Sequence, residues 1–594
     1  MSIVSESVHH DLLVLGLPLA VRGGCAPFAR ELTLRVESPG VAVVILRLTA
    51  SQAAVPSRQE FAFRCPVIDI HGIWRSSSDR NKGLMPSWGG SNDQARATSQ
   101  APVICAFGQR DDNRLTIACG DALHPTVMTL GIVEETAELH GTVVVFSTAH
   151  PATTDVSVEI RFDRREIAFH RALNDVATWW AQRYVPMPVP DIGRRPMYST
   201  WYSFHQVFEV PRVLEQCRIA KQLGCDAVIV DDGWQTLDGR RGYAYCGDWL
   251  PERIPAMAAY VAATHALGMA FILWYAVPFV GYHSAAYKRF SGCILRRDDR
   301  LETAVLDPRF PVVREYLIEL YAKAVQEWDL DGFKLDFVDS FCHDGSAPTT
   351  AIDGRDYADV DEAVDRLLAD VMRRLRALKP DILIEFRQSY IGPLMRTYGN
   401  LLRAGDCPAD AVANRVRTLD VRLLAGSTAT HADMLMWHPD EPVDAAALQF
   451  LNIIFSVPQL SVLLDGITEK HRPMVNYCTG WWNEHRDVLL DGELEPRQPA
   501  LLYPVVVAST ADKRVVAVYA DAIAEVGPTV PAQLWVVNGT RRERVVLELA
   551  EALGPRTVIV RDCCGLEVRR SRVDLVAGVH RLEVPPAGSL ALVH

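Results

Sequence analysis

The middle of the chain alternates short apolar segments with amphipathic helical segments, and this alternation restricts the fold more than any other feature. Within residues 311–328 and 361–378, apolar side chains recur at spacings of three and four, and Pro380 ends the second segment. The runs expected to form strands lie at 198–203, 227–230, 270–274, 332–337 and 382–386. Repeated strand–helix units from about 195 to 480 predict a (β/α)8 barrel. A doubly wound sheet is the weaker alternative, because no glycine-rich dinucleotide turn follows the first strand.

The sequence on both sides of this region is typical of β-structure. Residues 1 to about 165 contain short alternating β-branched runs separated by turn residues, which predict an antiparallel sandwich. Strand-like runs return after about residue 500. We therefore predict an α/β chain with an N-terminal β-sandwich over 1–185, the (β/α)8 TIM barrel over 190–490 and a small C-terminal β-sandwich domain over 500–594.

Composition excludes several classes of protein. The 594 residues include 73 acidic and 61 basic side chains, and the formal net charge is −12. Nucleic-acid binding requires clustered Lys and Arg, so no nucleic-acid partner is expected. The hydrophobic fraction of 49% and charged fraction of 23% are ordinary globular values and exclude a disordered or collagen-like chain.

The termini, apolar runs and cysteines predict a cytoplasmic protein without a membrane partner. No Lys or Arg precedes the first apolar stretch, so no signal peptide is expected. The longest apolar run, 269–280, is shorter than the ~20 residues of a spanning helix, and Pro278 interrupts it. Thirteen cysteines without C-x-x-C pairs indicate reduced thiols. Association into a homo-oligomer stays open.

Polar and aromatic residues gather at the C-terminal ends of the expected strands, where barrel enzymes carry their chemistry. A sixth strand is expected at 400–404, and its end adds further carboxylates. Strand by strand, these residues are Asp231, Asp232, Trp274, Lys334, Asp336, Glu385, Arg387, Arg403, Asp406 and Asp410. Carboxylates and tryptophans at one rim favour a sugar ligand, because sugar C–H faces stack on indole while hydroxyls donate to carboxylates. The first strand region offers only His205 as an imidazole ligand, so neither a metal nor another cofactor is expected.

Four motifs carry a specific resemblance. They are DDGWQ at 231–235, GDW at 247–249, Trp274, and KLD at 334–336. In this order and spacing they resemble the alpha-galactosidases of glycoside hydrolase clan D, and the family 36 melibiase group is the nearest match. The resemblance extends to the three-domain order, and so to most of the chain.

The resemblance implies a retaining hydrolase of terminal α-galactosides, or of a related galacto-configured sugar. In that family the aspartate of the K-x-D strand is the nucleophile, which is Asp336 here. The acid/base aspartate at the end of the sixth strand corresponds to Asp406, with Asp410 as the alternative. Double displacement through a covalent glycosyl-aspartate is then expected.

The same resemblance implies which groups bind a small carbohydrate, either an oligosaccharide or a glycoside. Asp231, Asp232 and Lys334 match the family's ligands of sugar hydroxyls, and Trp274 matches a sugar-facing tryptophan. Glu385, Arg387, Arg403 and Asp410 are further candidates for substrate binding because they occupy the same rim.

Two departures from the family pattern concern the identity of the sugar. Glu385–Gln388 stands where the family has a Cys-Ser-Gly-Gly-Gly-Gly motif, and Arg403 replaces a tryptophan before the acid/base. Two arginines at the pocket leave open an acidic or otherwise substituted sugar. Transfer to a sugar acceptor, as in raffinose-synthase-type enzymes, would use the same two aspartates and also stays open.

Structural alternatives accompany several of these assignments. Asp336 could close a salt bridge with Lys334, and Glu385 could pair only with Arg387. Other residues are as readily explained by loop hydrogen bonding or rim packing: Trp201, Trp234, Trp249, His431, Asp433 and His438.

Overall fold

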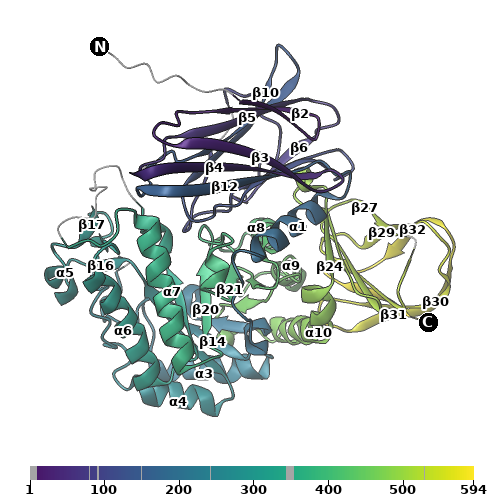
Figure 1. Ribbon diagram of the computed structural model, residues 1–594. Helices are drawn as coiled ribbons and strands as arrows, with labels where there is room; N and C mark the ends of the chain where they lie inside the picture. Colours follow the sequence, from purple (N-terminus) through teal and green to yellow (C-terminus); the bar gives the residue numbers. More distant parts are fainter. Residues whose placement is uncertain are drawn as a thin grey trace.

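The computed structural model describes residues 10–78, 80–89, 92–148, 150–240, 242–342, 354–527 and 529–593. The middle of the chain forms a (β/α)8 barrel, and in Figure 1 the N-terminal β-structure lies above the barrel and the C-terminal β-structure lies to its right. The predicted fold class is therefore confirmed. No helix in the described part of the chain is long and apolar enough to cross a membrane.

Two six-stranded antiparallel sheets form the N-terminal sandwich. The first contains, in spatial order, β1 (His10–Val14), β2 (Leu17–Arg22), β5 (Gln59–Pro66), β11 (Glu138–Val145), β10 (Thr126–Val133) and β7 (Asp93–Ala95). The second contains β3 (Ala29–Ser38), β4 (Val41–Ala54), β12 (Thr153–Asp163), β9 (Asn113–Cys119), β8 (Val103–Phe107) and β6 (Gly72–Arg75). Side chains alternate between the two faces of each strand, so the apolar faces of the sheets pack against each other.

Strand β8 is buried on both faces, and this attaches the sandwich to the rest of the molecule. Ile104 and Ala106 belong to the sandwich core. Val103, Cys105 and Phe107 point the other way and join the apolar cluster that contains α1 (Phe169–Ala181) and the barrel. The all-apolar sequence of β8 follows from these two burial environments.

Eight parallel strands form the barrel. In order they are β13 (Met197–Ser199), β14 (Ala227–Val230), β15 (Ala270–Ala276), β19 (Gly332–Asp336), β20 (Leu383–Arg387), β21 (Leu401–Arg403), β22 (Ala429–His431) and β23 (Gln459–Leu460). β13 pairs with both β14 and β23, and parallel bridges from His431 to Val457 and from Leu435 to Leu460 bring the chain after β22 beside β23. Both faces of these strands are covered, which explains their nearly continuous apolar sequences.

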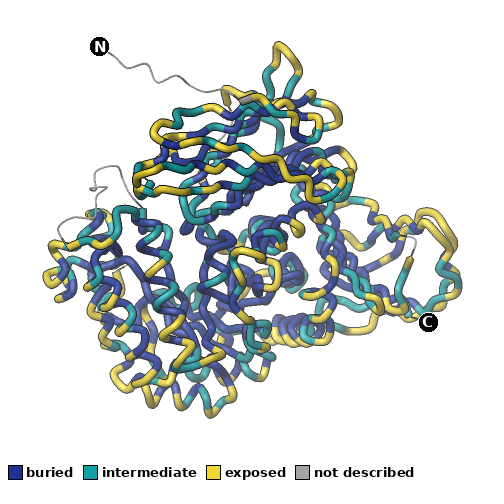
Figure 2. The backbone as a smooth tube through the Cα atoms, viewed as in Figure 1, coloured by how far each residue is buried: buried dark blue, intermediate teal, exposed yellow. Residues whose placement is uncertain are grey.

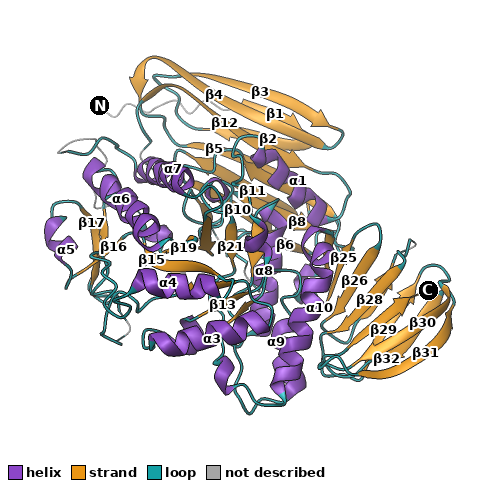
Figure 3. Ribbon diagram, turned by 90° about the horizontal axis from the view of Figure 1, so that it is seen from below, coloured by secondary structure: helices purple, strands orange, loops and turns teal. Residues whose placement is uncertain are grey.

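Helices surround the barrel strands (Figure 3). They are α2 (Trp201–Phe204), α3 (Val210–Gln222), α4 (Met257–Ala266), α5 (Ala285–Arg289), α6 (Pro311–Trp328), α7 (Val360–Leu378), α8 (Ala411–Ala425), α9 (Val443–Leu451) and α10 (His471–Asp491). The expected helix at 311–328 coincides with α6. Helix α7 begins after Asp359, whose side chain accepts a hydrogen bond from the Glu362 backbone N–H at 2.9 Å. This cap fixes the start of the helix.

The remaining elements are accessory to the barrel. Between β15 and β19 a small antiparallel sheet contains β16 (Phe279–Gly281), β18 (Thr303–Leu306) and β17 (Ile294–Asp298). Short 3-10 turns occur at η1 (Asp191–Arg194), η2 (Val338–Ser340), η3 (Met395–Thr397), η4 (Leu464–Gly466) and η5 (Pro499–Leu501). The sequence patterns did not indicate the small sheet, whose strands are only three to five residues long.

Two further sheets form the C-terminal β-structure. The larger contains β24 (Glu493–Arg497), β25 (Val505–Ser509), β26 (Lys513–Val518), β28 (Gln533–Asn538), β33 (Ser589–Val593), β30 (Gly554–Arg561) and β31 (Glu567–Leu575). The smaller contains β27 (Ile523–Val526), β29 (Arg544–Leu549) and β32 (Gly578–Glu583). Their outer surfaces are exposed, whereas the barrel interior is almost entirely buried (Figure 2).

All three parts of the chain meet at Asp420 on α8. This buried carboxylate accepts hydrogen bonds from Trp74 Nε1 and Lys82 Nζ, each at 2.8 Å, and from the Tyr503 hydroxyl. Trp74 and Lys82 come from the sandwich, whereas Tyr503 precedes β25. Lys82 and Asp420 are both almost inaccessible to solvent, so water screens their attraction little.

We expect Asp420→Asn to lower the free energy of unfolding by about 3–5 kcal/mol, because it removes the negative charge opposite a buried lysine. Urea unfolding monitored by tryptophan fluorescence measures the effect. The exposed Asp440→Asn serves as the matched control and should unfold like wild type. Equal stability of Asp420→Asn and wild type would contradict this account.

Candidate active site

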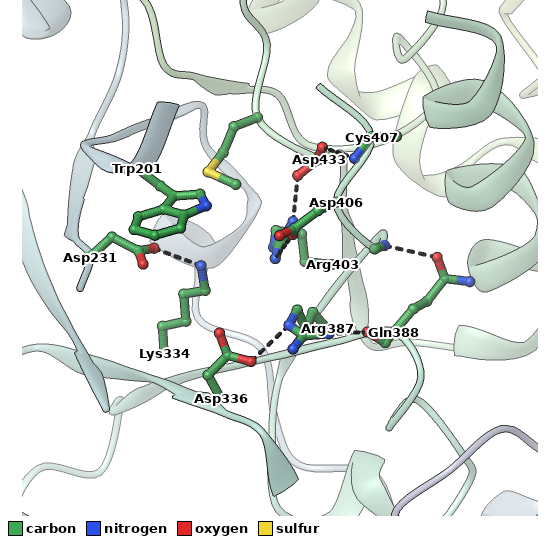
Figure 4. A network of polar contacts seen from close by, with 12 residues as sticks. Trp201, Asp231, Lys334, Asp336, Arg387, Gln388, Arg403, Asp406, Cys407 and Asp433 are labelled. Carbon is green, nitrogen blue, oxygen red and sulfur yellow. Dashed lines mark hydrogen bonds and ion pairs between the residues drawn. The ribbon is translucent and has the colours of Figure 1, made fainter. Parts of the chain in front are cut away.

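The C-terminal ends of β14, β19, β20 and β21 bring most of the predicted site residues into one polar network (Figure 4). Its members include Asp231, Lys334, Asp336, Glu385, Arg387, Arg403 and Asp406, joined by Asp433 after β22. Parallel pairing explains the convergence, because it places the carboxyl ends of all these strands on the same edge of the barrel.

Asp336 ends β19 and receives four hydrogen bonds. Its Oδ1 accepts from Arg387 Nε at 2.7 Å, the Tyr390 hydroxyl at 2.6 Å and the Phe337 backbone N–H at 2.8 Å. Its Oδ2 accepts from Trp274 Nε1 at 3.0 Å. The carboxyl group is therefore held in one orientation by groups that all donate to its oxygens.

These donors keep Asp336 ionised. Burial on its own raises the pKa of Asp336, but the positive charges of Arg387 and Lys334 and the hydrogen bonds from Tyr390 and Trp274 outweigh burial. The pKa of Asp336 is consequently far below its ordinary value. A permanently ionised carboxylate is suited to act as a nucleophile.

Lys334 pairs with Asp231 and not with Asp336. Lys334 Nζ lies 2.6 Å from Asp231 Oδ2, and both side chains are buried. Burial lowers the pKa of Lys334, but the negative charges of Asp231, Asp336 and Glu385 outweigh burial and the charge of Arg403, and the pKa is raised. The alternative in which Asp336 closes a salt bridge with Lys334 is therefore wrong. The partner of Asp336 is Arg387, which reaches it from the neighbouring strand.

Asp232 has no cationic partner of this kind. Its oxygens accept from Gln206 Nε2 at 2.5 Å and Gln235 Nε2 at 2.7 Å. Burial, reinforced by the negative charge of Asp231, raises the pKa of Asp232 to about 7, although the hydrogen bonds from the two amides oppose the rise. Asp231 and Asp232 are adjacent in sequence but differ in charge balance, because only Asp231 faces Lys334.

Arg403 on β21 is surrounded by three carboxylates. Its Nη1 lies 2.5 Å from Asp433 Oδ1, its Nη2 lies 2.8 Å from Asp406 Oδ1, and its Nε lies 3.5 Å from Glu385 Oε1. Gln459 Nε2 donates to Glu385 Oε2 at 2.5 Å. The alternative in which Glu385 pairs only with Arg387 is wrong, since each finds its partner on a neighbouring strand.

The structure separates the two acid/base candidates. The Asp406 side chain is 48% exposed at the barrel mouth. Asp410 instead caps α8, accepting from the Ala413 backbone N–H at 2.9 Å, and forms an ion pair with Arg80 of the sandwich. Helix capping and the ion pair with Arg80 therefore explain Asp410 without a catalytic role, and Asp406 is the better acid/base candidate.

The aromatic residues divide into two groups. Trp234 and Trp249 are buried, and their rings are stacked with centroids 5.8 Å apart, so they pack inside the rim. Trp274 is also buried, and its N–H is directed at Asp336. Trp201 is partly exposed and lies beside Asp231 and Lys334 (Figure 4). It is the tryptophan whose face is best placed to meet a ligand.

Sequence reasoning missed three polar groups of the site. Tyr390 donates to Asp336, and Tyr202 donates to Asp433 Oδ2 at 2.8 Å. Asp433 was interpreted as part of an ordinary loop, although it follows β22 at the same rim position as the other carboxylates. The strand-end rule applied to the seventh strand would have found Asp433, whereas no pattern marks the two tyrosines.

The sandwich also contributes to the barrel mouth. Gln388 Nε2 donates to Ser78 Oγ at 2.7 Å, and Gln388 Oε1 accepts from the Gly405 backbone N–H at 2.9 Å. Gln388 thus links the loops after β20 and β21 to the segment between β6 and β7. Among the described residues, no group of three or more His, Cys, Asp or Glu side chains is arranged to hold a metal ion.

Comparisons with known proteins agree with the motifs. Residues 183–392 match the family model described as Melibiase. Alpha-galactosidase 2 of Pediococcus pentosaceus is 27% identical over 199 residues, which are 32% of this chain and 27% of that protein. Alpha-galactosidase AgaA of Geobacillus stearothermophilus is 26% identical over 161 residues, 24% of this chain and 21% of that protein. The sequence matches thus span about a quarter of the length of these relatives.

Solved structures extend the similarity to the whole fold. The family 36 alpha-galactosidase AgaA of Geobacillus stearothermophilus superposes with a TM-score of 0.65 at 14% identity, covering 98% of this chain and 84% of that one. An alpha-galactosidase from Lactobacillus brevis gives 0.64 at 13% identity, covering 100% and 84%. The predicted resemblance to family 36 alpha-galactosidases is confirmed.

The raised pKa of Asp232 makes a prediction for stability. Below pH ~4 the carboxyl is protonated in both the folded and the unfolded chain. Between pH ~4 and the folded pKa of about 7, only the folded state holds the proton, so stability falls as pH rises across this window. Asp232→Asn should remove this fall and be more stable than wild type at pH 8, by about 4 kcal/mol.

Urea unfolding at pH 5 and pH 8 checks the prediction. The buried Gln206 Oε1, to which no described group donates, offers an acceptor for the new amide if the Gln206 side chain turns over. The exposed Asp512→Asn is the control and should follow wild type at both pH values. A stability difference that is the same at pH 5 and pH 8 would argue against a raised pKa.

Proposed function

We propose that this chain is a retaining glycoside hydrolase that cleaves terminal α-galactosides, or a closely related galacto-configured sugar. The observation that carries the proposal is a pair of unlike carboxylates at one rim. Asp336 is buried, ionised and held by four donors, whereas Asp406 is half-exposed at the mouth. Glycoside cleavage uses one carboxylate at the anomeric carbon and one carboxyl at the leaving oxygen.

In the first step, Asp336 Oδ attacks the anomeric carbon and the glycosidic bond breaks. Asp406 gives its proton to the departing oxygen, so the aglycone leaves as a neutral alcohol and a glycosyl ester forms on Asp336. The same donors that hold Asp336 fix its attack direction. Arg387 and Tyr390 on Oδ1 leave Oδ2, which carries only the Trp274 hydrogen bond, as the less encumbered oxygen.

In the second step, Asp406 acts as base. It takes a proton from water, the resulting oxygen attacks the anomeric carbon, and the ester bond to Asp336 breaks. Asp336 returns to its ionised state and Asp406 is protonated again. Two inversions at the anomeric carbon give net retention.

The remaining rim residues are proposed to bind the sugar. The Lys334–Asp231 pair offers a donor and acceptors for adjacent hydroxyls, and Trp201 offers an aromatic face. Trp274 orients Asp336. Structures of AgaA have been solved in complex with raffinose and with stachyose, which supports a small oligosaccharide as the substrate class.

A neutral sugar is favoured over an acidic one. The Arg403 guanidinium is buried among Glu385, Asp406 and Asp433, and Arg387 is paired with Asp336. Neither arginine has its charge available for a substrate carboxylate. A cytoplasmic location is part of the proposal and fits thirteen cysteines that are all free.

A panel of para-nitrophenyl α-glycosides tests the proposal. We expect the α-galactoside to be cleaved faster than the glucoside, xyloside and N-acetylgalactosaminide. It should also be cleaved faster than the galacturonide, because the arginines are already neutralised. Asp336→Ala should reduce kcat at least about 1,000-fold, since the nucleophile is lost. Proton NMR of the first-formed sugar should show the α-anomer.

An activated 2-deoxy-2-fluoro α-galactoside provides a second readout. It should add covalently to wild type at Asp336, as located by peptide mass spectrometry, and not to Asp336→Ala. Asp440→Asn is the activity control. Wild-type turnover by Asp336→Ala would refute the nucleophile assignment, and a β-anomer as first product would refute retention. Faster cleavage of the galacturonide would favour the acidic-sugar alternative.

A further inference from the structure

One guanidinium bridges two carboxylates at the mouth of the barrel. Arg403 donates through Nη2 to Asp406 and through Nη1 to Asp433 (Figure 4). Arg403 is only 1% exposed. Charges in such a position interact strongly because little water lies between them.

The two carboxylates have unequal surroundings. Asp433 is completely buried, and besides Arg403 it accepts from the Tyr202 hydroxyl at 2.8 Å and the Cys407 backbone N–H at 2.6 Å. Three donors favour its ionised form. Asp406 is half-exposed, and Arg403 is the donor that the described structure gives its side chain. Asp406 is therefore the member that can exchange a proton with a ligand.

We propose that Asp433 is a positioning residue that keeps Asp406 able to carry a proton, by neutralising Arg403 through the other nitrogen of the guanidinium. The inference rests on the proposed function, in which Asp406 is the general acid. It assigns Asp433 no contact with the substrate. Asp433 acts through Arg403.

The surrounding charges determine in which direction the pKa values of Asp406 and Asp433 shift. Within the described structure, the titratable and charged groups beside this cluster are Lys334, Glu385, Arg387, Tyr202, Cys407, His431 and Arg417, and Asp231 and Asp336 pair with Lys334 and Arg387. Burial raises the pKa of Asp406, but Arg403, Lys334 and Arg387 outweigh burial and hold it below its ordinary value. For Asp433 the balance has the opposite sign: burial and the negative charge of Asp406 raise its pKa above the ordinary value, although the charge of Arg403 and the hydrogen bonds from Cys407 and Tyr202 oppose them.

Removing Asp433 and removing Arg403 should therefore shift the pKa of Asp406 in opposite directions. Without the Asp433 charge, the whole positive charge of Arg403 acts on Asp406 and favours its ionised form. Without Arg403, the negative charge of Asp433 faces Asp406 directly and favours its protonated form. A purely structural role for these residues predicts no such opposition.

The test is the alkaline limb of kcat, which reports the complex with bound substrate and where activity is lost as Asp406 deprotonates. With 4-methoxyphenyl α-galactoside, whose leaving group needs a proton, Asp433→Asn should move this limb to lower pH by about one unit. Arg403→Gln should move it to higher pH. With 2,4-dinitrophenyl α-galactoside, which departs without a proton, Asp433→Asn should change kcat/KM less than threefold.

Thermal unfolding shows whether each variant is folded. Two further variants keep the test valid if a first variant does not fold. Arg403→Lys keeps the charge and should restore the limb toward its wild-type position. Tyr202→Phe removes one donor to Asp433 and should shift the limb in the same direction as Asp433→Asn, but by less. If Asp433→Asn does not fold, Tyr202→Phe replaces it.

The outcomes separate the inference from the proposed function. The inference would be overturned if Asp433→Asn and Arg403→Gln moved the alkaline limb in the same direction. It would also be overturned if activity fell equally on both substrates without a shift of the limb. In either case, cleavage by the wild-type protein would still support the proposed function. A wild-type protein that cleaves neither galactoside would overturn both.

Discussion

The register of the parallel barrel strands is the constraint on which the site depends. One layer of side chains pairs Lys334 on β19 with Trp274 on β15 and with Glu385 on β20. One layer further along, Arg387 on β20 is paired with Arg403 on β21. Residues two apart on a strand face the same side. A shift of one residue in any strand would direct its charged side chain into the apolar layer between barrel and helices, so the apolar pattern of the strands also fixes the chemistry at their ends.

Charge balance within this register determines which residues can react. Three cations of the described structure lie at the rim of the barrel, and each contacts at least one carboxylate: Lys334 contacts Asp231, Arg387 contacts Asp336, and Arg403 contacts Glu385, Asp406 and Asp433. Desolvation makes an unpaired buried charge costly, so these partners are required for stability as well as for function. The same arrangement leaves Asp406 the most exposed of these carboxylates, and exposure is what a group needs to meet a leaving oxygen.

The sequence was sufficient for the barrel and for most rim residues, because both follow from short-range patterns. Helix α6 coincides with its expected bounds since its period and its end signals are local. Partner choice was harder. Glu385 and Arg387 lie two apart and invite pairing, yet lateral contacts to Arg403 and Asp336 prevail, and these depend on distances between strands that no spacing reveals. Tyr390 and Tyr202 were missed for the same reason, since the loop after β20 and the short helix α2 after β13 place them.

The sandwich is part of the site and not an independent appendage. Its segment between β6 and β7 supplies Ser78 to Gln388 and Arg80 to Asp410, which hold the loop that follows Arg387 at the end of β20 and the loop that carries Asp406. Trp74 and Lys82 anchor the same segment to Asp420 on α8. A barrel without the sandwich would keep its strand register but lose these supports, and Asp420 would retain only Tyr503 of its three donors. The geometry of Asp406 relative to Asp336 is therefore a property of the whole chain, because two of the loops that define it are braced from outside the barrel.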